Sequence, residues 1–394
     1  MVDSFIPQIR FKMCKNQWEK NKLSKLAKFN PKSTLPEKFK YVDLESVLGT
    51  DLISYREVSR ENAPSRAQRL AQKGDIFYQT VRPYQKNNYL FDSNEKDYVF
   101  STGYAQLRPL IDGAFLLARL QEESFVNMVL ERCTGTSYPA INSKDLSKIS
   151  VTIPQTIEEQ SAIGSLFRIL DDLLTSYKEN LANYQSLKTT TLSKMFPKTG
   201  ESVPEIRLDG FEGEWKSDTF ESYLTESRIL GDSGLDAKKI TVKLWGKGVV
   251  EKEEKYAGSS NTQYYIRKAG QFIYSKLDFQ NQAFGIIPTE LDGYQSTLDL
   301  PTFDVKGIDT KFLLEYVMRR EFYEYQGLIA NGSRKAKRIH PDDFLSMPVR
   351  IPSLAEQQAL GGYFSNLDQL ITSYRGKITQ LETLKKKLLQ DMFI

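Results

Sequence analysis

Arginine, lysine, glutamine and tyrosine residues cluster on both sides of a Lys73-Gly74-Asp75 turn in the first half of the chain. Arginine and glutamine present paired hydrogen-bonding groups that match base edges, and lysine binds phosphate as a compact positive charge. The clusters therefore suggest contact with DNA, while a solvated surface explains any one residue equally well. The candidate residues are Ser65, Arg66, Gln68, Arg69, Gln79, Thr80, Arg82, Tyr84, Gln85, Lys86, Thr136, Ser137 and Tyr138.

A second set of candidates lies in the second half, around Gly270 and after Gly332-Ser333. The formal net charge of +4 says little about a partner, but the segment from Arg10 to Lys40 holds ten Lys and Arg against two acidic residues. Local basic clusters of this kind suit phosphate contact. The second set is Arg267, Lys268, Tyr274, Ser275, Lys276, Arg334, Lys335, Lys337 and Arg338.

Groups that could carry out catalysis are scarce. His340 is the only histidine, and the sequence has no GxxxxGK(S/T) phosphate loop and no glycine-rich loop typical of methyl-donor binding. The adjacent Asp342-Asp343 pair follows Pro341, a pattern that indicates a helix start. We therefore expect no catalytic residue, no metal site and no cofactor in this chain.

The two cysteines, Cys14 and Cys133, lack the spacing of a disulfide framework or a zinc cluster. We expect buried, inert thiols and a reducing cytoplasm as the setting. No run of 18 apolar residues occurs, so the sequence predicts no membrane span.

The elements that position these residues follow from an internal repeat. The segment 161–177 resembles 358–374, so that Phe167 matches Phe364 and Asp171 matches Asp368, each 197 residues apart. The same offset relates Pro7–Arg10 to Pro204–Arg207, Trp18 to Trp215, and Met195-Phe196 to Met392-Phe393. Because 394 is twice 197, the chain is a duplicated unit from end to end.

The two copies agree unevenly. Their tails are similar, whereas residues 30–130 barely resemble residues 227–327. A shared frame therefore carries two different inserts, which is what two different recognition surfaces would require.

The tail of each copy predicts a long helix with apolar residues in 4-3-4-3 spacing, typical of a narrow seam for one partner helix. From Glu158 to Met195 such a helix is about 57 Å long, too long to be buried on a small domain. We predict that the two tails pair antiparallel; the alternative is two amphipathic helices docked on separate cores. The helix-pairing residues are Leu170, Leu174, Tyr177, Leu181, Tyr184, Leu367, Ile371, Tyr374, Ile378, Leu381 and Leu388.

The front of each copy predicts a mixed α+β domain. Strands are expected at 98–100, 149–153, 249–250 and 347–351, and after the turns near Gly74 and Gly270. Helices are expected at 115–132 and 310–325. The predicted architecture is therefore two globular α+β domains, 1–152 and 198–349, separated by two long antiparallel helices, 153–197 and 350–394, that form a coiled coil.

The combined motif resembles a known family. An Ile-Pro or Pro segment is followed by Glu159-Gln160 or Glu356-Gln357, then by Ala-Ile/Leu-Gly, Phe, Leu-Asp and a terminal Met-Phe. This order is similar to the specificity subunit of type I restriction–modification enzymes, over essentially the whole chain. The second copy departs from this pattern in two ways: Gly270-Gln271 stands where Gly-Asp is usual, and there is one residue fewer between Pro352 and Glu356.

The resemblance implies two target-recognition domains that each read one half of a split site in double-stranded DNA. It implies helices that act as a spacer and dock two methyltransferase subunits, with motor-endonuclease subunits added for cleavage. S-adenosylmethionine, ATP and magnesium would belong to those partners, and this chain would itself do no chemistry.

Two other classes of function remain open from the residues alone. One is an autonomous nuclease or methyltransferase with an unrecognised site, which would be active as the purified chain. The other is a coiled-coil scaffold that binds only proteins, which would show no sequence-selective, salt-sensitive retention of DNA.

Overall fold

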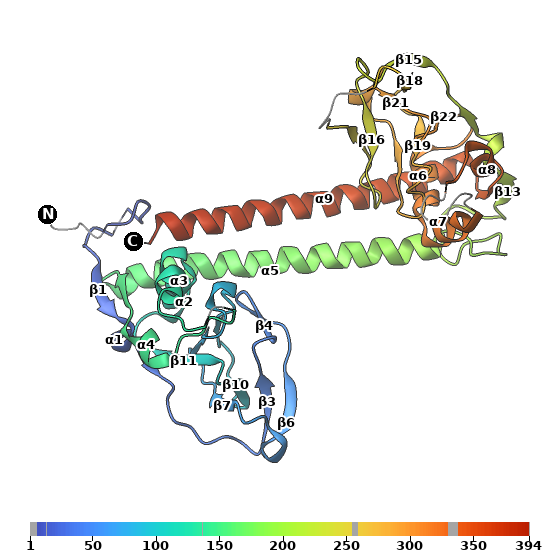
Figure 1. The fold of residues 1–394 in the computed structure, drawn as a ribbon. Coiled ribbons are helices and arrows are strands. Elements are labelled where there is room, and N and C mark those ends of the chain that lie inside the picture. The colour runs from blue at the N-terminus through green and yellow to red at the C-terminus, as the bar shows by residue number, and fades with distance from the viewer. Residues whose placement is uncertain (1–5, 13, 136, 254–258, 330–337, 394) are drawn as a thin grey trace. The chain divides into compact units, whose positions relative to one another are not determined.

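The computed structural model describes residues 6–12, 14–135, 137–253, 259–329 and 338–393. The chain divides into two compact units: unit 1 combines Met1–Glu179 with Arg375–Ile394, and unit 2 is Asn180–Tyr374. Each unit holds a globular part of strands and short helices together with portions of two long helices (Figure 1). The predicted mixed fold is confirmed, but each unit takes helix segments from both tails, so the units do not coincide with the boundaries drawn from the sequence.

The same four-stranded antiparallel sheet occurs in both units. Its order is β2-β11-β8-β9 in unit 1 and β14-β22-β19-β20 in unit 2, and the pairs β1-β12 and β13-β23 also correspond. The common frame therefore extends into the region where the two halves share little sequence. The strands are β1 Glu19–Lys22, β2 Ala27–Phe29, β8 Ile76–Gln79, β9 Tyr89–Leu90, β11 Tyr104–Pro109, β12 Ser150–Ile153, β13 Lys216–Thr219, β14 Leu224–Glu226, β19 Phe272–Tyr274, β20 Phe284–Ile286, β22 Thr302–Val305 and β23 Pro348–Ile351.

The remaining strands differ between the units. Unit 1 has a second four-stranded sheet, β6-β3-β10-β7, in which β10 runs parallel to β3, and a short β4-β5 hairpin. Unit 2 has a three-stranded sheet, β15-β18-β21, and a β16-β17 hairpin. These strands are β3 Lys38–Val42, β4 Val47–Leu48, β5 Asp51–Leu52, β6 Arg56–Ser59, β7 Ala67–Leu70, β10 Tyr98–Ser101, β15 Leu230–Ser233, β16 Ile240–Val242, β17 Val249–Glu251, β18 Gln263–Ile266 and β21 Gln295–Ser296.

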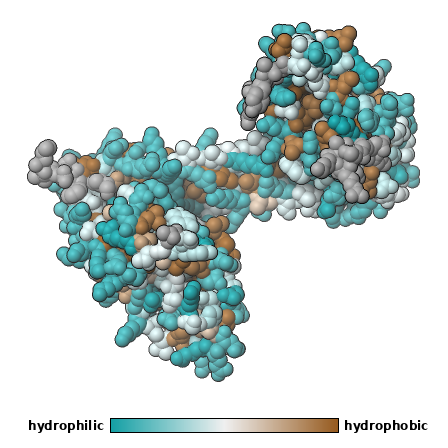
Figure 2. All heavy atoms as spheres, in the orientation of Figure 1, coloured by the Kyte–Doolittle hydropathy of each residue, from teal (hydrophilic) through white to brown (hydrophobic). Residues whose placement is uncertain are grey.

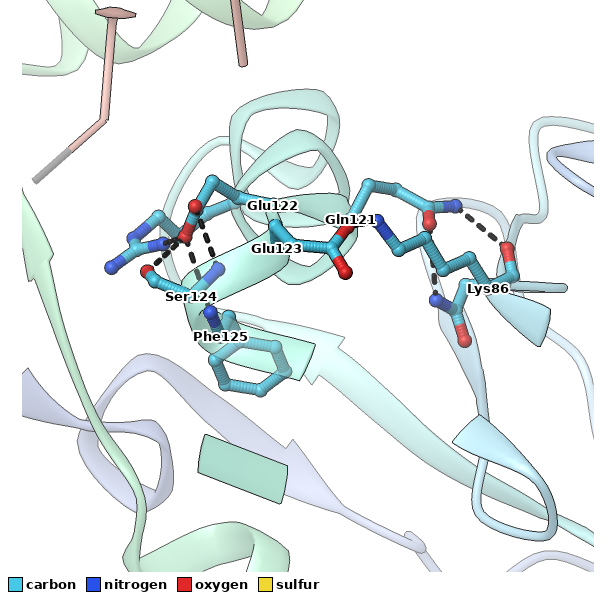
Figure 3. A network of polar contacts seen from close by, with 8 residues as sticks. Lys86, Gln121, Glu122, Glu123, Ser124 and Phe125 are labelled. Atoms are coloured by element: carbon cyan, nitrogen blue, oxygen red, sulfur yellow. Dashed lines mark hydrogen bonds and ion pairs between the residues drawn. The ribbon is translucent and has the colours of Figure 1, made fainter. Parts of the chain in front are cut away.

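The two mid-domain helices are each broken into two, which corrects the continuous helices expected at 115–132 and 310–325. Glu122 and Arg319, at equivalent positions of the repeat, both have extended backbones with ψ of 143° and 138°. The Glu122 carboxylate accepts hydrogen bonds from the backbone nitrogens of Ser124 and Phe125, so it caps the second helix (Figure 3). The short helices are α1 Leu23–Leu26, α2 Gly113–Gln121, α3 Glu123–Leu130, α4 Ser143–Lys148, α6 Thr310–Met318, α7 Arg320–Gln326 and α8 Pro341–Leu345.

The long helices are α5 Ile157–Lys194 and α9 Leu354–Asp391, each of 38 residues. In unit 1, Asp171 and Lys178 of α5 pair with Lys385 and Glu382 of α9. Because the α9 number falls as the α5 number rises, the two segments run antiparallel.

In unit 2, the other halves of the same helices pair. Lys188 contacts Asp368, and the rings of Tyr184 and Tyr374 lie 5.3 Å apart. The predicted helix pairing is therefore confirmed inside each unit. Of the predicted seam residues, Leu170, Leu174, Leu367 and Ile371 are buried, and Tyr177, Leu181, Tyr184, Tyr374, Ile378, Leu381 and Leu388 are half-buried.

The end of each long helix enters the core of a globular part. Phe393, just after α9, lies among Trp18, Phe115 and Phe167 in unit 1. Phe196, just after α5, lies among the equivalent Trp215, Phe312 and Phe364 in unit 2. Burial of an aromatic ring stabilises such a junction by about 2–3 kcal/mol, so both helix ends are fixed along their axes.

A guanidinium group covers each of these phenylalanines, but from different positions. Arg119 lies over Phe393 at 5.6 Å from the ring centre, and Arg319 lies over Phe196 at 4.7 Å. Arg319 corresponds in the repeat to Glu122, which is the ion-pair partner of Arg119. The cation–π contact is thus kept, while the residue that supplies it lies three positions later in the repeat in unit 2.

Within the described ranges, the helices are too short or too polar for any of them to span a lipid bilayer. Cys14 and Cys133 are free thiols of intermediate exposure, so the expectation of full burial is wrong.

Candidate DNA interface and the frame that positions it

The turn before β8 is built around a buried carboxylate. Asp75 accepts a hydrogen bond from the backbone nitrogen of Gln72 at 2.9 Å and pairs with Arg108 at 2.8 Å. In unit 2, Gln271 accepts from the backbone nitrogen of Lys268 at 2.8 Å and donates to Asp304 at 2.7 Å. Where unit 1 pairs the acidic Asp75 with the basic Arg108, unit 2 pairs the neutral Gln271 with the acidic Asp304. Both turns keep the bond to the backbone nitrogen three residues earlier.

Two of the predicted clusters meet in unit 1. The backbone nitrogen of Arg82 donates to the carbonyl of Pro139 at 2.8 Å, and the Arg82 guanidinium lies 4.4 Å from the ring centre of Tyr138. Arg82 adopts a left-handed conformation with φ of 55°. A non-glycine residue is rarely found in that conformation, and outliers of this kind concentrate at functional sites.

The predicted cluster at Ser65–Arg69 is joined to the same region by the turn at Thr102-Gly103. The backbone nitrogen of Thr102 donates to the carbonyl of Arg66 at 2.8 Å, and the nitrogen of Thr80 donates to the carbonyl of Gly103 at 2.9 Å. One surface, which we call the unit 1 loop surface, therefore gathers residues that are far apart in sequence. Its exposed candidates are Ser65, Arg66, Gln68, Tyr84, Gln85, Ser137 and Tyr138, and its half-buried candidates are Arg69, Arg82 and Lys86.

Lys86 and Arg69 are constrained within this surface. The Lys86 ammonium lies 2.5 Å from Glu123, and the backbone carbonyl of Lys86 accepts from Gln121, which ties the loop to α2 and α3 (Figure 3). Burial lowers the pKa of the Arg69 guanidinium. Both residues are therefore less available to DNA than their charge alone indicates.

Five predicted DNA contacts are buried, and this is a correction to the sequence-based list. The exposed fraction is 7% or less for each of them: Gln79 and Thr80 of unit 1, and Arg267, Tyr274 and Ser275 of unit 2. Arg267 is the clearest case: its guanidinium donates to Ser296 and to the carbonyl of Ser227, and burial lowers its pKa to about 10. These five side chains are therefore buried in the fold and are not exposed at the surface of either unit.

In unit 2 an equivalent junction joins the loop after β19 to the segment before α8. The backbone nitrogen of Ile339 donates to the carbonyl of Lys276 at 3.1 Å, and Arg338 lies 3.8 Å from Asp299. Lys268 is exposed on the preceding turn. These residues form the unit 2 loop surface; the predicted contacts Thr136, Arg334, Lys335 and Lys337 lie outside the described residues.

Sequence reasoning missed Trp245 at the tip of the β16-β17 hairpin. Its side chain is 58% exposed, its φ is 61°, and its backbone nitrogen donates to Asn281 in the loop that follows Lys276. Lys243 and Lys247 flank it in sequence. The available signal was an aromatic residue beside glycine and between two lysines, whose charges suit contact with phosphate. Hydrophilic residues cover most of the visible face of both globular parts (Figure 2).

The Glu-Gln motif at the start of each long helix, Glu159-Gln160 and Glu356-Gln357, connects that helix to its globular part. Glu159 accepts from Arg10 at 2.6 Å, and Glu356 accepts from the equivalent Arg207 at 2.8 Å. Gln160 bonds the backbone nitrogen of Asp112 at 3.2 Å, as Gln357 does with the nitrogen of Asp309 at 2.9 Å. Since the same bonds recur, the one-residue difference near Pro352 leaves the junction unchanged.

The glycine of the same motif allows close helix packing. A Cβ at Gly164 would lie 2.6 Å from the Oδ1 atom of Asp112, which caps α2, and a Cβ at Gly361 would lie 2.7 Å from Oδ1 of Asp309. Both distances are well below van der Waals contact. The motif therefore encodes a fixed seat for each long helix on its globular part.

Among the residues that the structure describes, no group of three or more His, Cys, Asp or Glu residues is placed to hold a metal ion. Each unit therefore presents a loop surface on a frame fixed by the Glu-Gln and glycine contacts of its long helix.

Comparisons with known proteins agree with this architecture. Residues 15–184 match the family described as the type I restriction modification DNA specificity domain. The HindI specificity subunit of Haemophilus influenzae is 30% identical over 139 residues, which are 34% of this chain and 30% of that protein. The MjaVIII specificity subunit of Methanocaldococcus jannaschii is 22% identical over 310 residues, which are 72% of this chain and 70% of that protein.

Solved structures share the fold. A type I restriction–modification S subunit from M. genitalium matches with a TM-score of 0.63 and 13% identity, over 99% of both chains. A chain from a type I system described for complex assembly and conformational transition matches with a TM-score of 0.52 and 17% identity, over 95% of this chain and 97% of that one. Residues 15–184 therefore match the type I restriction modification DNA specificity domain, and the whole chain has the fold of these solved structures.

Proposed function

We propose that the two globular parts are target-recognition domains that each read one half of a bipartite site in double-stranded DNA. The observation that carries this proposal is one frame with two different loop surfaces. The β2-β11-β8-β9 sheet and its counterpart position loops at equivalent places, while the second sheets and the loop residues differ. Two different readers on one repeated frame suit a site whose halves differ in sequence.

Recognition would use both phosphate and base contacts. Arg66, Gln68 and Arg82 have groups that match guanine or adenine edges, and one well-placed bidentate pair contributes about 1–3 kcal/mol of discrimination. Lys268, Lys276 and Arg338 would set affinity through phosphate. Affinity should therefore fall steeply as the salt concentration rises.

The paired helices would fix the separation of the half-sites and dock two methyltransferase subunits. Their antiparallel pairing inside each unit and the aromatic anchors at both ends support a rigid spacer. The chain itself would be non-catalytic and cytoplasmic. The partner subunits would supply S-adenosylmethionine, ATP and magnesium for methylation and for motor-driven cleavage.

The test is selection of bound sequences from random double-stranded DNA by the chain assembled with its methyltransferase. We expect two short defined half-sites separated by a gap of constant length. A single continuous site, or retention without sequence preference, would contradict the proposal. Methyl transfer or cleavage by the purified chain alone would favour the autonomous enzyme, and a flat salt titration would favour the protein-binding scaffold.

A further inference from the structure

Two glutamines of unit 1 are joined by a hydrogen bond across the loop that follows β8. The side chain of Gln79, at the end of β8, is 2% exposed, whereas Gln85 lies on the exposed part of the loop. The Nε2 atom of Gln79 donates to Oε1 of Gln85 at 2.8 Å and to the backbone carbonyl of Val81 at 2.7 Å. Both N–H groups of the Gln79 amide are therefore in use.

These bonds determine the orientation of the Gln85 amide. A carbonyl oxygen only accepts hydrogen bonds, so the Gln79 atom beside the carbonyl of Val81 must be the Nε2 donor. The same nitrogen can bond only to an acceptor of Gln85, which is Oε1. In the part of the chain that the structure describes, Nε2 of Gln85 donates no hydrogen bond. The Gln85 amino group is therefore free to bind a ligand at the surface.

The fold itself gives little reason for a glutamine at position 79. Its Oε1 atom is buried and has no hydrogen-bond partner among the described residues, which costs free energy of folding. Unit 2 has Ser275 at the equivalent position, and its hydroxyl bonds to Asp278 of its own loop at 3.2 Å. The shared frame therefore does not require Gln79, and its amide points to a role specific to unit 1.

The backbone next to Gln85 is also held in place. Lys86 has a φ of 57°, and its carbonyl accepts from Gln121 of α2 at 3.1 Å (Figure 3). The side-chain oxygen of Asn87 accepts from the backbone nitrogen of Gly49 in the β4-β5 hairpin at 2.9 Å. Because Gln85 is already ordered, its binding to a ligand costs less conformational entropy than binding by a free surface glutamine.

An amide held in this orientation matches one base better than the others. In the major groove, adenine presents an N6 donor beside an N7 acceptor. The second lone pair of Gln85 Oε1 can accept from N6 while Nε2 donates to N7. Guanine presents two acceptors there, one of which would face Oε1, and thymine and cytosine each present a single hydrogen-bonding group. Two hydrogen bonds therefore form only with adenine.

We propose that Gln85 reads an adenine in the half-site bound by unit 1, and that Gln79 is a positioning residue that orients the Gln85 amide. This inference rests on the proposed function, because it requires unit 1 to read double-stranded DNA. The pair belongs to one reader only, since Ser275 takes the place of Gln79 in unit 2.

The test compares the sequences that are selected from random double-stranded DNA by the full-length chain and its variants, each assembled with the methyltransferase. Gln85→Ala should reduce the preference for adenine at one position of one half-site about five- to 150-fold, with the other half-site unchanged. Gln85→Glu should shift the preference at that position from adenine toward cytosine, because a carboxylate accepts from N4 of cytosine.

A second arm tests the positioning role. Gln79→Met removes the donor but keeps an unbranched side chain, and should reduce the preference for adenine at the same position about three- to tenfold. Because Gln79 acts through Gln85, the double variant Gln79→Met, Gln85→Ala should lose no more than Gln85→Ala alone. The control is Gln155→Met, which changes an exposed glutamine outside the loop surface and should change neither half-site.

An unchanged preference in Gln85→Ala, a loss at a base other than adenine, or retention of adenine by Gln85→Glu would overturn the assignment of Gln85. An effect of Gln79→Met at another position, additive losses in the double variant, or failure of Gln79→Met to assemble would overturn the positioning role. Selection of the second half-site shows that each variant complex is folded. If the unaltered complex selects no pair of half-sites, the proposed function fails instead.

Discussion

The Nζ atom of Lys188 in α5 lies 2.7 Å from Oδ2 of Asp368 in α9. Lys385 and Asp171 form the same pair with the roles of the helices exchanged, because both residues are offset by one repeat. Lys188 also continues the 4-3-4-3 apolar spacing of its helix, so a charged residue occupies a seam position. A polar residue at such a position specifies register at some cost in stability. We infer that these ion pairs fix the register of the two paired helices.

The first prediction concerns the strength of this pair. A double-mutant cycle with Lys188→Met and Asp368→Asn should give a coupling free energy of about 1–2 kcal/mol, because the pair is partly shielded from solvent. Urea unfolding measures it. The control is Lys178 with Glu382, a pair whose side chains are both 53% exposed. That pair should give about 0.5 kcal/mol or less, and equal couplings would remove the basis for a register role.

The second prediction concerns the helix seats. Gly164→Ala should destabilise the chain by about 1–3 kcal/mol although alanine favours helix, because the added methyl group meets Asp112 and the backbone nitrogen of Phe115, each at 2.6 Å. Gly361→Ala should behave similarly. The matched controls are Gly362→Ala and Gly376→Ala, where nothing lies within 4 Å of a new Cβ. Thermal unfolding should show that the two control variants gain up to about 1 kcal/mol in the free energy of unfolding. A gain for Gly164→Ala would contradict close packing of α5 against Asp112.

The third prediction concerns pH. Burial raises the pKa of Glu315 to about 7, Lys188 opposes this shift, and the carboxylate of Asp368 reinforces it. The folded chain therefore holds this proton more tightly than the unfolded chain does. The resulting stability is complete below the ordinary glutamate pKa of about 4.3 and is lost as the pH rises through about 7.

Unfolding of Glu315→Gln and of the unaltered chain at pH 5 to 8 measures this effect. The variant should gain stability relative to the unaltered chain as the pH rises. Glu382→Gln, which changes an exposed glutamate of α9, should follow the unaltered chain. A constant difference between Glu315→Gln and the unaltered chain across this range would show that Glu315 stays ionised in the fold.

The fourth prediction separates the two readers. Arg82→Ala should weaken base preference in one half-site only, because Arg82 belongs to the unit 1 loop surface. Trp245→Ala should weaken recognition of the other half-site only, because the backbone of Trp245 is bonded to the loop that follows Lys276 in unit 2. Trp245→Phe keeps an aromatic face and should retain most of the affinity. Sequence selection with each variant measures both effects, and a loss spread over both half-sites from either variant would argue against independent readers.

Much of the frame could be predicted because it repeats. The offset between Phe167 and Phe364 identified the duplicated tails, and the apolar spacing from Leu170 to Tyr184 identified the seam. The breaks at Glu122 and Arg319 could not be predicted, because apolar residues resume after both positions, at Phe125 and Phe322, and it is the extended backbone at Glu122 and Arg319 that ends the first helices. Propensity is local, whereas a cap depends on where the next turn begins.

The site was harder to predict for a related reason. Arg267 and Lys268 look alike in a sequence, yet one side chain is fully buried on backbone carbonyls and the other is exposed. A positive charge does not indicate whether a side chain points into the core or toward solvent. The alternation of buried and exposed residues along a strand would indicate it, but that alternation is not clear in the sequence here.

The most direct test of the account lengthens the paired helices together. Seven residues inserted after Lys178 in α5 and seven after Lys377 in α9 preserve the heptad spacing of the apolar residues. They lengthen the helix pair by about 10 Å. Selection of bound DNA by the assembled complex should then yield the same two half-sites with a gap longer by about three base pairs. An unchanged gap, or the same gap with altered half-site bases, would contradict a helical bar that sets the distance between two readers.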